Sequence, residues 1–184
     1  MQNIMVDLET MGTKSNAAIV GIGACEFDRD QVGKTFYRPV NLASSVARGL
    51  TMEPSTIMWW LGQSESARQA IRFGTYPLDQ ALTEFANWVL DCAPRDNVRI
   101  WAKGPTFDCA ILAHAYGVCD IEKPWRFWND RCVRTVIARN PSVTEPAREG
   151  TAHNAQDDAV HQAKWLIAIE QRRTPISLIT TEQT

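Results

Sequence analysis

The sequence predicts an α/β fold in which a mixed central sheet, a three-strand antiparallel meander plus parallel strands, is flanked by helices. Three apolar runs separated by short turns lie near the N-terminus and predict the meander. Further along, helical patterns alternate with a short apolar run, which is typical of α/β proteins. The 184 residues, 45% of them hydrophobic and 22% charged, suit one soluble domain with a sizeable core.

The individual elements follow from apolar periodicity and turn residues. The strands of the meander are expected around Ile4-Met5-Val6, at 17–27 and at 35–40, with Asp28-Arg29-Asp30 as a turn. In chain order, the remaining expected elements are helices at 54–61 and 78–90, a strand at 99–102, and helices at 107–116, 132–138 and 154–172. Residues 1–173 are expected to form a single domain, and 174–184 a short, polar, poorly ordered tail.

Composition narrows the setting of the protein. No apolar run approaches the ~20 residues that cross a bilayer, and no signal peptide is recognisable, so no membrane partner is expected. The five cysteines are odd in number and contain no CxxC pair, which favours free buried thiols in a cytoplasmic protein. The net charge of -2 gives no sign of a general nucleic-acid binder but does not exclude one, since an acidic metal site subtracts charge locally.

Two acids interrupt the first strand. Asp7 and Glu9 are two residues apart, and alternate residues of a strand share a face, so both carboxylates project from the same side. Two solvated acids at a strand end would be the ordinary interpretation, but Ile4, Val6 and Leu8 indicate a covered central strand. Like charges in such a place are costly without a cation. The pair therefore predicts a metal site, provided that further carboxylates converge on it.

Asp108 is the third candidate ligand. It falls in the first turn of the helix expected at 107–116, with Thr106 as a possible N-cap and Gly117 as the stop. Acids favour helix N-termini for their own sake. Asp108, however, shares its stripe with Ile111 and Leu112, which directs it toward the sheet.

The last helix offers two adjacent acids. Its apolar stripe contains Ala155, Ala159, Ala163, Leu166 and Ile169. Asp158 lies at the border of this stripe and is expected to face inward. Asp157 is expected on the wet face together with His161. His153 can approach Asp158 only if it precedes the helix, on the loop; a lone histidine is otherwise a cap or a surface residue.

Taken in order, these residues resemble the DEDDh exonucleases. The pattern consists of D-x-E on a first strand, F-D opening a mid-chain helix and H-x-x-x-x-D at a final helix, and it spans most of the chain. The stretches DLETMG and TIMWWLGQS further resemble the subgroup that contains T-even phage exonuclease A and bacterial 3′-5′ exoribonucleases. One departure is Lys103-Gly104-Pro105-Thr106, where many members carry Asn a few residues before the second-motif Asp.

The resemblance implies a ribonuclease-H-like fold and a metal-dependent 3′-5′ exonuclease. Its substrate would be single-stranded DNA or RNA with a 3′ end, and its products nucleoside 5′-monophosphates. Two ions, Mg²⁺ or Mn²⁺, would be held by Asp7, Glu9, Asp108 and Asp158, because hard cations prefer oxygen ligands. His153 would act as the general base. The resemblance also implies a homodimer, because several small relatives pair.

Other residues are candidates for substrate contacts. In the family, backbone after D-x-E holds the terminal sugar, which points to Thr10 and Met11, although Met11 could instead pack in the core. Trp59 or Trp60 could stack on bases, whereas burial is the commoner fate of tryptophan. Basic residues that could steer phosphates are Lys103, Arg126, Arg131 and Arg148.

Three other functions are weighed against the exonuclease. A haloacid-dehalogenase phosphatase is set aside, because that chemistry needs Asp and Thr where Glu9 and Met11 stand. An endonuclease of the same fold shares the carboxylates and stays open. A non-catalytic nucleic-acid-binding module is disfavoured, since concentrated negative charge near phosphate does not help binding.

Overall fold

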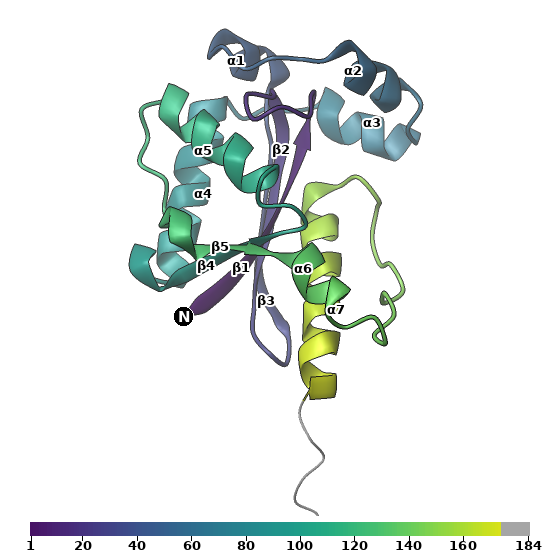
Figure 1. The fold of residues 1–184 in the computed structure, drawn as a ribbon. Helices are drawn as coiled ribbons and strands as arrows, with labels where there is room; N and C mark the ends of the chain where they lie inside the picture. The colour runs from purple at the N-terminus through teal and green to yellow at the C-terminus, as the bar shows by residue number, and fades with distance from the viewer. Residues whose placement is uncertain (174–184) are drawn as a thin grey trace, which may run out of the picture.

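The computed structural model describes residues 1–173 and contains a five-stranded sheet in the order β3-β2-β1-β4-β5 (Figure 1). β1, β2 and β3 form an antiparallel meander, while β4 and β5 run parallel to β1. The predicted mixed sheet is thus confirmed. The strands are β1 Gln2–Thr10, β2 Ile19–Phe27, β3 Val32–Pro39, β4 Val98–Ala102 and β5 Asp130–Cys132. The tail predicted at 174–184 lies outside the described residues.

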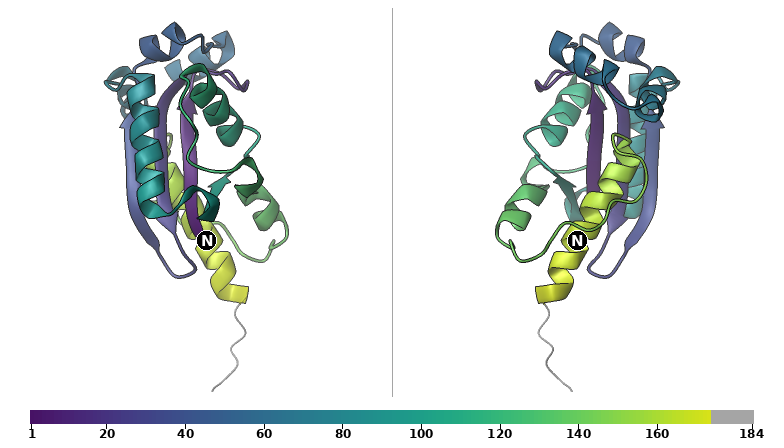
Figure 2. Two further views of the ribbon diagram at one scale, coloured as in Figure 1. Left: turned by 90° about the vertical axis from the view of Figure 1, so that its left-hand side faces the viewer. Right: turned by 90° about the vertical axis from the view of Figure 1, so that its right-hand side faces the viewer.

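Helices cover both faces of the sheet. α4 and α5 lie on one face, α6 and α7 lie on the other, and α1–α3 gather near the end of the sheet where β1 finishes (Figures 1 and 2). The helices are α1 Leu42–Ala47, α2 Pro54–Leu61, α3 Glu65–Arg72, α4 Leu78–Cys92, α5 Asp108–Val118, α6 Val133–Ala138 and α7 Ala155–Arg173, with short 3₁₀ turns η1 Arg95–Asn97 and η2 Phe127–Asn129.

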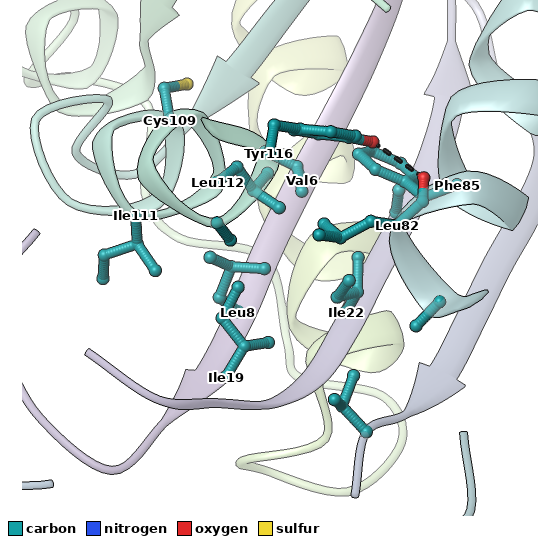
Figure 3. Close-up of a cluster of buried hydrophobic side chains, with 14 of the residues drawn as sticks. Val6, Leu8, Ile19, Ile22, Leu82, Phe85, Cys109, Ile111, Leu112 and Tyr116 are labelled. Atoms are coloured by element: carbon teal, nitrogen blue, oxygen red, sulfur yellow. Dashed lines mark hydrogen bonds between the residues drawn. The ribbon is translucent and has the colours of Figure 1, made fainter. Parts of the chain in front are cut away.

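β1 is buried on both faces. Because its side chains point alternately to the two faces, Val6 and Leu8 lie on one face and the two acids lie on the other. Val6 and Leu8 point into an apolar cluster with α4 and α5 (Figure 3). In that cluster the hydroxyl of Tyr116 donates a 3.0 Å hydrogen bond to the carbonyl of Leu82, which satisfies its buried polar atom. Met5 belongs to the second cluster, against α7. Because side chains alternate along a strand, Asp7 and Glu9 face the same side as Met5.

Three short elements were not predicted from the sequence. α1 is six residues long and is nucleated by Asn41, whose Oδ1 accepts a 3.0 Å hydrogen bond from the Ser44 amide. α3 is only eight residues long and mostly polar. β5 is three residues long and pairs with β4 through tertiary contacts rather than strand propensity.

The bounds of α5 were predicted incorrectly at both ends. Phe107, not Thr106, is the N-cap residue, and no side chain caps the helix. Gly117 lies inside the helix, which continues to Val118. A Cβ at Gly117 would meet no atom within 4 Å, so this glycine has an exposed place in the last turn, where it is tolerated rather than needed as a stop.

Two predictions from composition can be compared with the structure. All five cysteines are free thiols; Cys25 and Cys109 are buried, and the other three are half-buried. Within residues 1–173, no helix has both the length and the apolar character needed to cross a bilayer.

Candidate active site

Three carboxylates converge where β1 meets the start of α7. Asp7, Glu9 and Asp158 each offer an oxygen atom, and these atoms all lie within 4.8 Å of one another. Asp7 is half-buried and Glu9 is buried. One Glu9 oxygen, Oε1, is buried and has no hydrogen-bond partner. A buried, unpaired carboxylate oxygen beside two further acids fits a bound cation, because oxygen ligands and negative charge suit Mg²⁺ and Mn²⁺.

A glycine in β2 allows α7 to come this close. Gly23 pairs with Asp7 across the antiparallel ladder, so any side chain at 23 would share the face of the acids. A Cβ there would lie 2.0 Å from the backbone carbon of Ala155. Only glycine therefore lets the first turn of α7 rest on β2, and this contact brings Asp158 to Asp7 and Glu9.

Asp108 approaches the same acids from the opposite layer. It is buried at the first position of α5, and its Oδ1 accepts a 3.2 Å hydrogen bond from the backbone amide of Leu8. Leu8 lies between Asp7 and Glu9 in β1, so this bond fixes Asp108 at the edge of the acidic cluster.

The acids disfavour one another's ionisation. Burial, followed by the charges of Asp108, Glu9 and Asp158, raises the pKa of Asp7 well above its usual range. Burial and the charges of Asp158 and Asp108 raise the pKa of Glu9 to about 8. Burial also raises the pKa of Asp108 to about 7, although the hydrogen bond from Leu8 and the charge of Arg134 act in the opposite direction. Bound cations would offset the repulsion between the carboxylates and favour their charged forms.

Without divalent cations, the protein should therefore lose stability as pH rises from 5 to 8. In that range the folded state holds protons on Glu9 and Asp108 that the unfolded chain has released, so the free energy of unfolding falls with pH. We expect the melting temperature in EDTA to fall by roughly 5–10 °C, corresponding to a few kcal/mol. Mn²⁺ should reverse the fall at pH 8, and Glu9→Gln should flatten the pH dependence. An equally steep fall in Glu9→Gln would place its origin elsewhere.

His153 precedes α7, which its approach to Asp158 requires. Its backbone amide donates a 3.1 Å hydrogen bond to Asp158 Oδ2, and its φ is 62°, in the left-handed region. The half-buried imidazole packs edge-on against Trp59, with ring centroids 4.9 Å apart. Strained backbone of this kind persists where surrounding contacts hold it, and it concentrates at functional sites.

The two adjacent acids of α7 have different surroundings. Asp158 faces Asp7 and Glu9 and also forms an ion pair with Arg148 from the preceding loop. Asp157 points away: its Oδ2 accepts a 2.7 Å hydrogen bond from the Thr151 amide. Gly150, at φ 78°, lies so close to Asp157 that a Cβ there would be 2.5 Å from the carboxylate carbon. Asp157 thus shapes the loop that carries His153.

The prediction that His161 lies on the wet face was wrong. His161 is buried, and its Nε2 lies 2.8 Å from Oε1 of Glu145. The loop between α6 and α7 folds back over this side of α7 and covers the histidine, and a helical wheel cannot anticipate such a cover.

Replacing the two adjacent acids should separate chemistry from structure. We expect Asp158→Asn to lower kcat/KM by at least ~100-fold, because it removes a charged ligand. Asp157→Asn should cost only about 1 kcal/mol of stability through weaker loop hydrogen bonds and leave kcat/KM within a few-fold of wild type. Melting curves and nuclease rates of both variants test this, and equal losses of activity would contradict the assignment.

Two pockets adjoin the acids. The pocket that we call the terminal pocket has a volume of about 380 Å³. It is lined by Leu8, Glu9, Thr10, Gly12, Thr13, Ser55, Thr56, Trp59, Trp60 and Phe107. The second, which we call the leaving-side pocket, has a volume of about 260 Å³ and is lined by Asp7, Leu8, Lys103, Gly104, Phe107, Asp108 and Arg134. Leu8 and Phe107 line both, so the pockets meet beside the acids.

The paired tryptophans play different parts. Trp60 is 3% exposed, and its indole N–H donates a 2.9 Å hydrogen bond to the carbonyl of Thr10. It therefore holds the backbone at the end of β1. Trp59 is 45% exposed and presents its ring to the terminal pocket and to His153. Of the two, only Trp59 has a free aromatic surface for a base.

Of the other two expected substrate contacts, Thr10 and Met11, only Thr10 lines the terminal pocket. Thr10 lines the terminal pocket, with its hydroxyl donating to the carbonyl of Gly12 at 2.7 Å. Met11 packs in the core and does not line the terminal pocket, and its amide and carbonyl are bonded to Ala18 and Glu53. The position of Met11 therefore matches the alternative expectation, that its side chain packs in the core.

The basic candidates also separate into two groups. Lys103 lines the leaving-side pocket, with its Nζ 5.5 Å from the centroid of the Trp165 ring. Arg126 is paired with Asp96, and Arg131 donates to backbone carbonyls of 128 and 130. These two arginines line neither of the pockets beside the acids.

Sequence reasoning missed Gln162 and Arg134. Gln162 is buried one turn after Asp158, and its Nε2 donates a 2.7 Å hydrogen bond to Asp7 Oδ1. Its place four residues after Asp158, on the same face of α7, was a usable signal. Arg134 reaches the leaving-side pocket from α6, and no local pattern predicted that approach.

The sequence is similar to those of known nucleases. The family profile of the Rv2179c-like 3′-5′ exoribonuclease domain matches residues 2–170. The exodeoxyribonuclease of Enterobacteria phage T4 is 28% identical over 199 residues, which cover 88% of this chain and 84% of the phage protein.

Solved structures share the fold at low sequence identity. The nuclease domain of 3′hExo, described as a DEDDh family member bound to rAMP, superposes with a TM-score of 0.60 at 12% identity, covering 94% of this chain and 92% of that domain. Pop2p of S. pombe, in a form with bound Mg²⁺ and Mn²⁺, gives a TM-score of 0.53 at 16% identity, covering 93% and 83% of the two chains.

Proposed function

The chain belongs to the family of Rv2179c-like 3′-5′ exoribonuclease domains, and from this premise we propose that Asp7, Glu9, Asp108, Asp158 and His153 are the active site of its 3′-5′ exonuclease activity. The observation that carries the proposal is the acidic cluster: three carboxylates within 4.8 Å, one with a buried unpartnered oxygen, beside a histidine tied to the third. Residues 1–173 are proposed to act as one catalytic domain.

We propose that the enzyme uses two divalent metal ions, Mg²⁺ or Mn²⁺, held by the four carboxylates. Asp7, Glu9 and Asp158 would hold one ion, and Asp7 with Asp108 the other. When bound, the ions stabilise negative charge on the scissile phosphate. The hydrogen bond from Gln162 to Asp7 and the amide of Leu8 on Asp108 keep these carboxylates oriented.

His153 accepts the proton of the attacking water in this proposal. Its backbone is tied to Asp158 and its ring rests on Trp59, so the imidazole is held beside the acids without being needed as a ligand. The electrons of the broken P–O3′ bond stay on the 3′ oxygen of the penultimate nucleotide. That oxygen takes a proton, and a nucleoside 5′-monophosphate is released.

The terminal pocket is proposed to receive the 3′-terminal nucleoside. It combines an exposed face of Trp59 for the base with Thr10, Thr13, Ser55 and Thr56, whose hydroxyls suit a sugar. Single-stranded ends fit this arrangement, because the base must be unstacked to reach an aromatic side chain.

RNA is the proposed substrate, since the family profile that describes an exoribonuclease matches residues 2–170. DNA is the second candidate, favoured by the match to a phage exodeoxyribonuclease. Matched 5′-labelled single-stranded RNA and DNA, each with Mg²⁺ or Mn²⁺, decide between them. We expect a ladder that shortens from the 3′ end and disappears in EDTA, with faster loss of RNA.

The same assay separates the rival functions. Cleavage of a circular single strand would indicate an endonuclease of this fold. Binding without shortening, at any metal concentration, would indicate a binding module. The proposed homodimer rests on the family resemblance alone, and light scattering at micromolar concentration measures it directly.

A further inference from the structure

Arg134 approaches the active site from α6, a helix that contributes none of the acids. Gly104, in the turn after β4, lies under its guanidinium: a Cβ at Gly104 would be 3.0 Å from Arg134 Nη1 and 3.7 Å from Cζ. The guanidinium therefore packs against the backbone of Gly104, and Arg134 lines the leaving-side pocket together with Asp7 and Asp108.

The charge of Arg134 acts on the acids, but its guanidinium forms no ion pair with any of them. Its charge lowers the pKa of Asp108, but the pair forms no ion pair within 4.0 Å. Across residues 1–173, the other arginine beside the acids, Arg148, is engaged with Asp158, whereas no hydrogen bond or ion pair occupies the guanidinium of Arg134. Arg134 is an exposed residue, and a guanidinium that lines a pocket offers donors in a fixed fork that matches phosphate oxygens.

Lys103 adds a second positive charge to the same pocket. Its ammonium lies over the ring of Trp165, with Nζ 5.5 Å from the ring centroid. The hydrogen bond with His161 and, after it, the charge of Lys103 lower the pKa of the neighbouring Glu145. The leaving-side pocket is thus lined by two acids and by two cationic side chains, one from the turn after β4 and one from α6. The terminal pocket, by contrast, is lined by hydroxyls, aromatics and one acid, with no lysine or arginine.

This asymmetry gives the substrate a direction. If the terminal nucleoside occupies the terminal pocket and the scissile phosphate lies on the acids, the chain must continue past Leu8 and Phe107, which the two pockets share. The penultimate nucleotide then enters the leaving-side pocket. Its own 5′-phosphate brings a second negative charge close to Asp7 and Asp108.

We propose that Arg134, assisted by Lys103, binds the phosphodiester that joins the second and third nucleotides from the 3′ end. The inference rests on the proposed function and deepens it. The enzyme would bind the negatively charged phosphodiester that lies one linkage upstream of the bond it cleaves. Lys103 would supply the contact from the turn after β4, and Arg134 would supply it from α6.

A pair of substrates isolates this contact. The p-nitrophenyl ester of a nucleoside 5′-monophosphate offers a terminal nucleoside and a scissile phosphate but no upstream linkage, whereas a trinucleotide offers all three. Arg134→Ala should lower kcat/KM for the trinucleotide by about tenfold to hundredfold, the range for a hydrogen bond to a charged group, mainly through KM. Hydrolysis of the ester should be unchanged, which also shows that the variant is folded.

A chemical change in the substrate should reproduce the loss. In a trinucleotide whose second linkage is a neutral methylphosphonate, wild-type kcat/KM should fall to the level of Arg134→Ala, and the variant should lose little more. Arg139→Ala is the matched control, because it removes the same charge from the far end of α6, outside the pocket. Arg134→Lys should restore part of the rate.

The outcomes are distinct. Equal loss on ester and trinucleotide would mean that Arg134 acts through Asp108 or the fold, and an unchanged trinucleotide rate would mean that it does not touch substrate; both overturn the proposal. A wild-type protein that cleaves the trinucleotide but is indifferent to the methylphosphonate overturns it while leaving the exonuclease intact. A wild-type protein that cleaves neither substrate overturns the exonuclease assignment itself.

Discussion

Asp7→Asn should abolish most nuclease activity while making the metal-free protein more stable. Asp7 is the central acid of the cluster, facing Glu9, Asp158 and Asp108, and its oxygens are proposed to serve both cations. Loss of one negative ligand removes several kcal/mol of transition-state stabilisation, so we expect kcat to fall by roughly 10³-fold or more.

The stability half of this prediction has the opposite sign. Burial and three neighbouring acids raise the pKa of Asp7, which means that its charged form is disfavoured in the folded state. Asparagine keeps the shape and can still meet Gln162, without the repulsion. Melting in EDTA at pH 8 should therefore occur at a higher temperature in Asp7→Asn than in wild type. A variant that kept near wild-type nuclease rates would overturn the metal assignment, and one that was both inactive and destabilised would indicate simple misfolding.

His153→Ala should lose ~10²- to 10⁴-fold in kcat, the usual value of a positioned general base. The variant should still bind Mn²⁺ and a single-stranded oligonucleotide, because in the proposal the imidazole is not a ligand and only the backbone of 153 contacts Asp158. Single-turnover rates measure the loss of chemistry, and titration with Mn²⁺ and oligonucleotide measures retention of binding.

Trp59→Leu is the control that distinguishes the orientation of the His153 imidazole from its role as general base. The edge contact between His153 and Trp59 fixes the orientation of the imidazole, so its loss should cost less than loss of the imidazole itself, about tenfold, together with weaker binding of the terminal base. Full turnover in His153→Ala would make His153 a loop residue and would require another proton acceptor.

The sequence was sufficient for the parts of the site that local periodicity controls. Alternation along a buried strand placed Asp7 and Glu9 on one face, and the wheel of α7 separated Asp158 from Asp157. The meander followed from three apolar runs and their turns, and β4 and β5 extend it with strands parallel to β1. These inferences depend only on residues close together in the chain.

What the sequence did not reveal depends on contacts between distant segments. Gly23 matters because the backbone of Ala155 lies against it, and nothing near residue 23 announces a helix that begins 132 residues later. His161 is buried by a loop, and Arg134 lines the pocket beside the acids from α6, the helix that follows the three-residue edge strand β5. Such placements are decided by packing, which local propensity does not encode.

Catalysis by this site requires divalent cations on the four carboxylates. The most direct measurement is anomalous diffraction from crystals grown with Mn²⁺ and a nucleoside 5′-monophosphate. We expect two anomalous peaks, one among the oxygens of Asp7, Glu9 and Asp158 and one beside Asp7 and Asp108, with the nucleoside in the terminal pocket. An active protein whose crystals show Mn²⁺ elsewhere, and none at these carboxylates, would contradict the account.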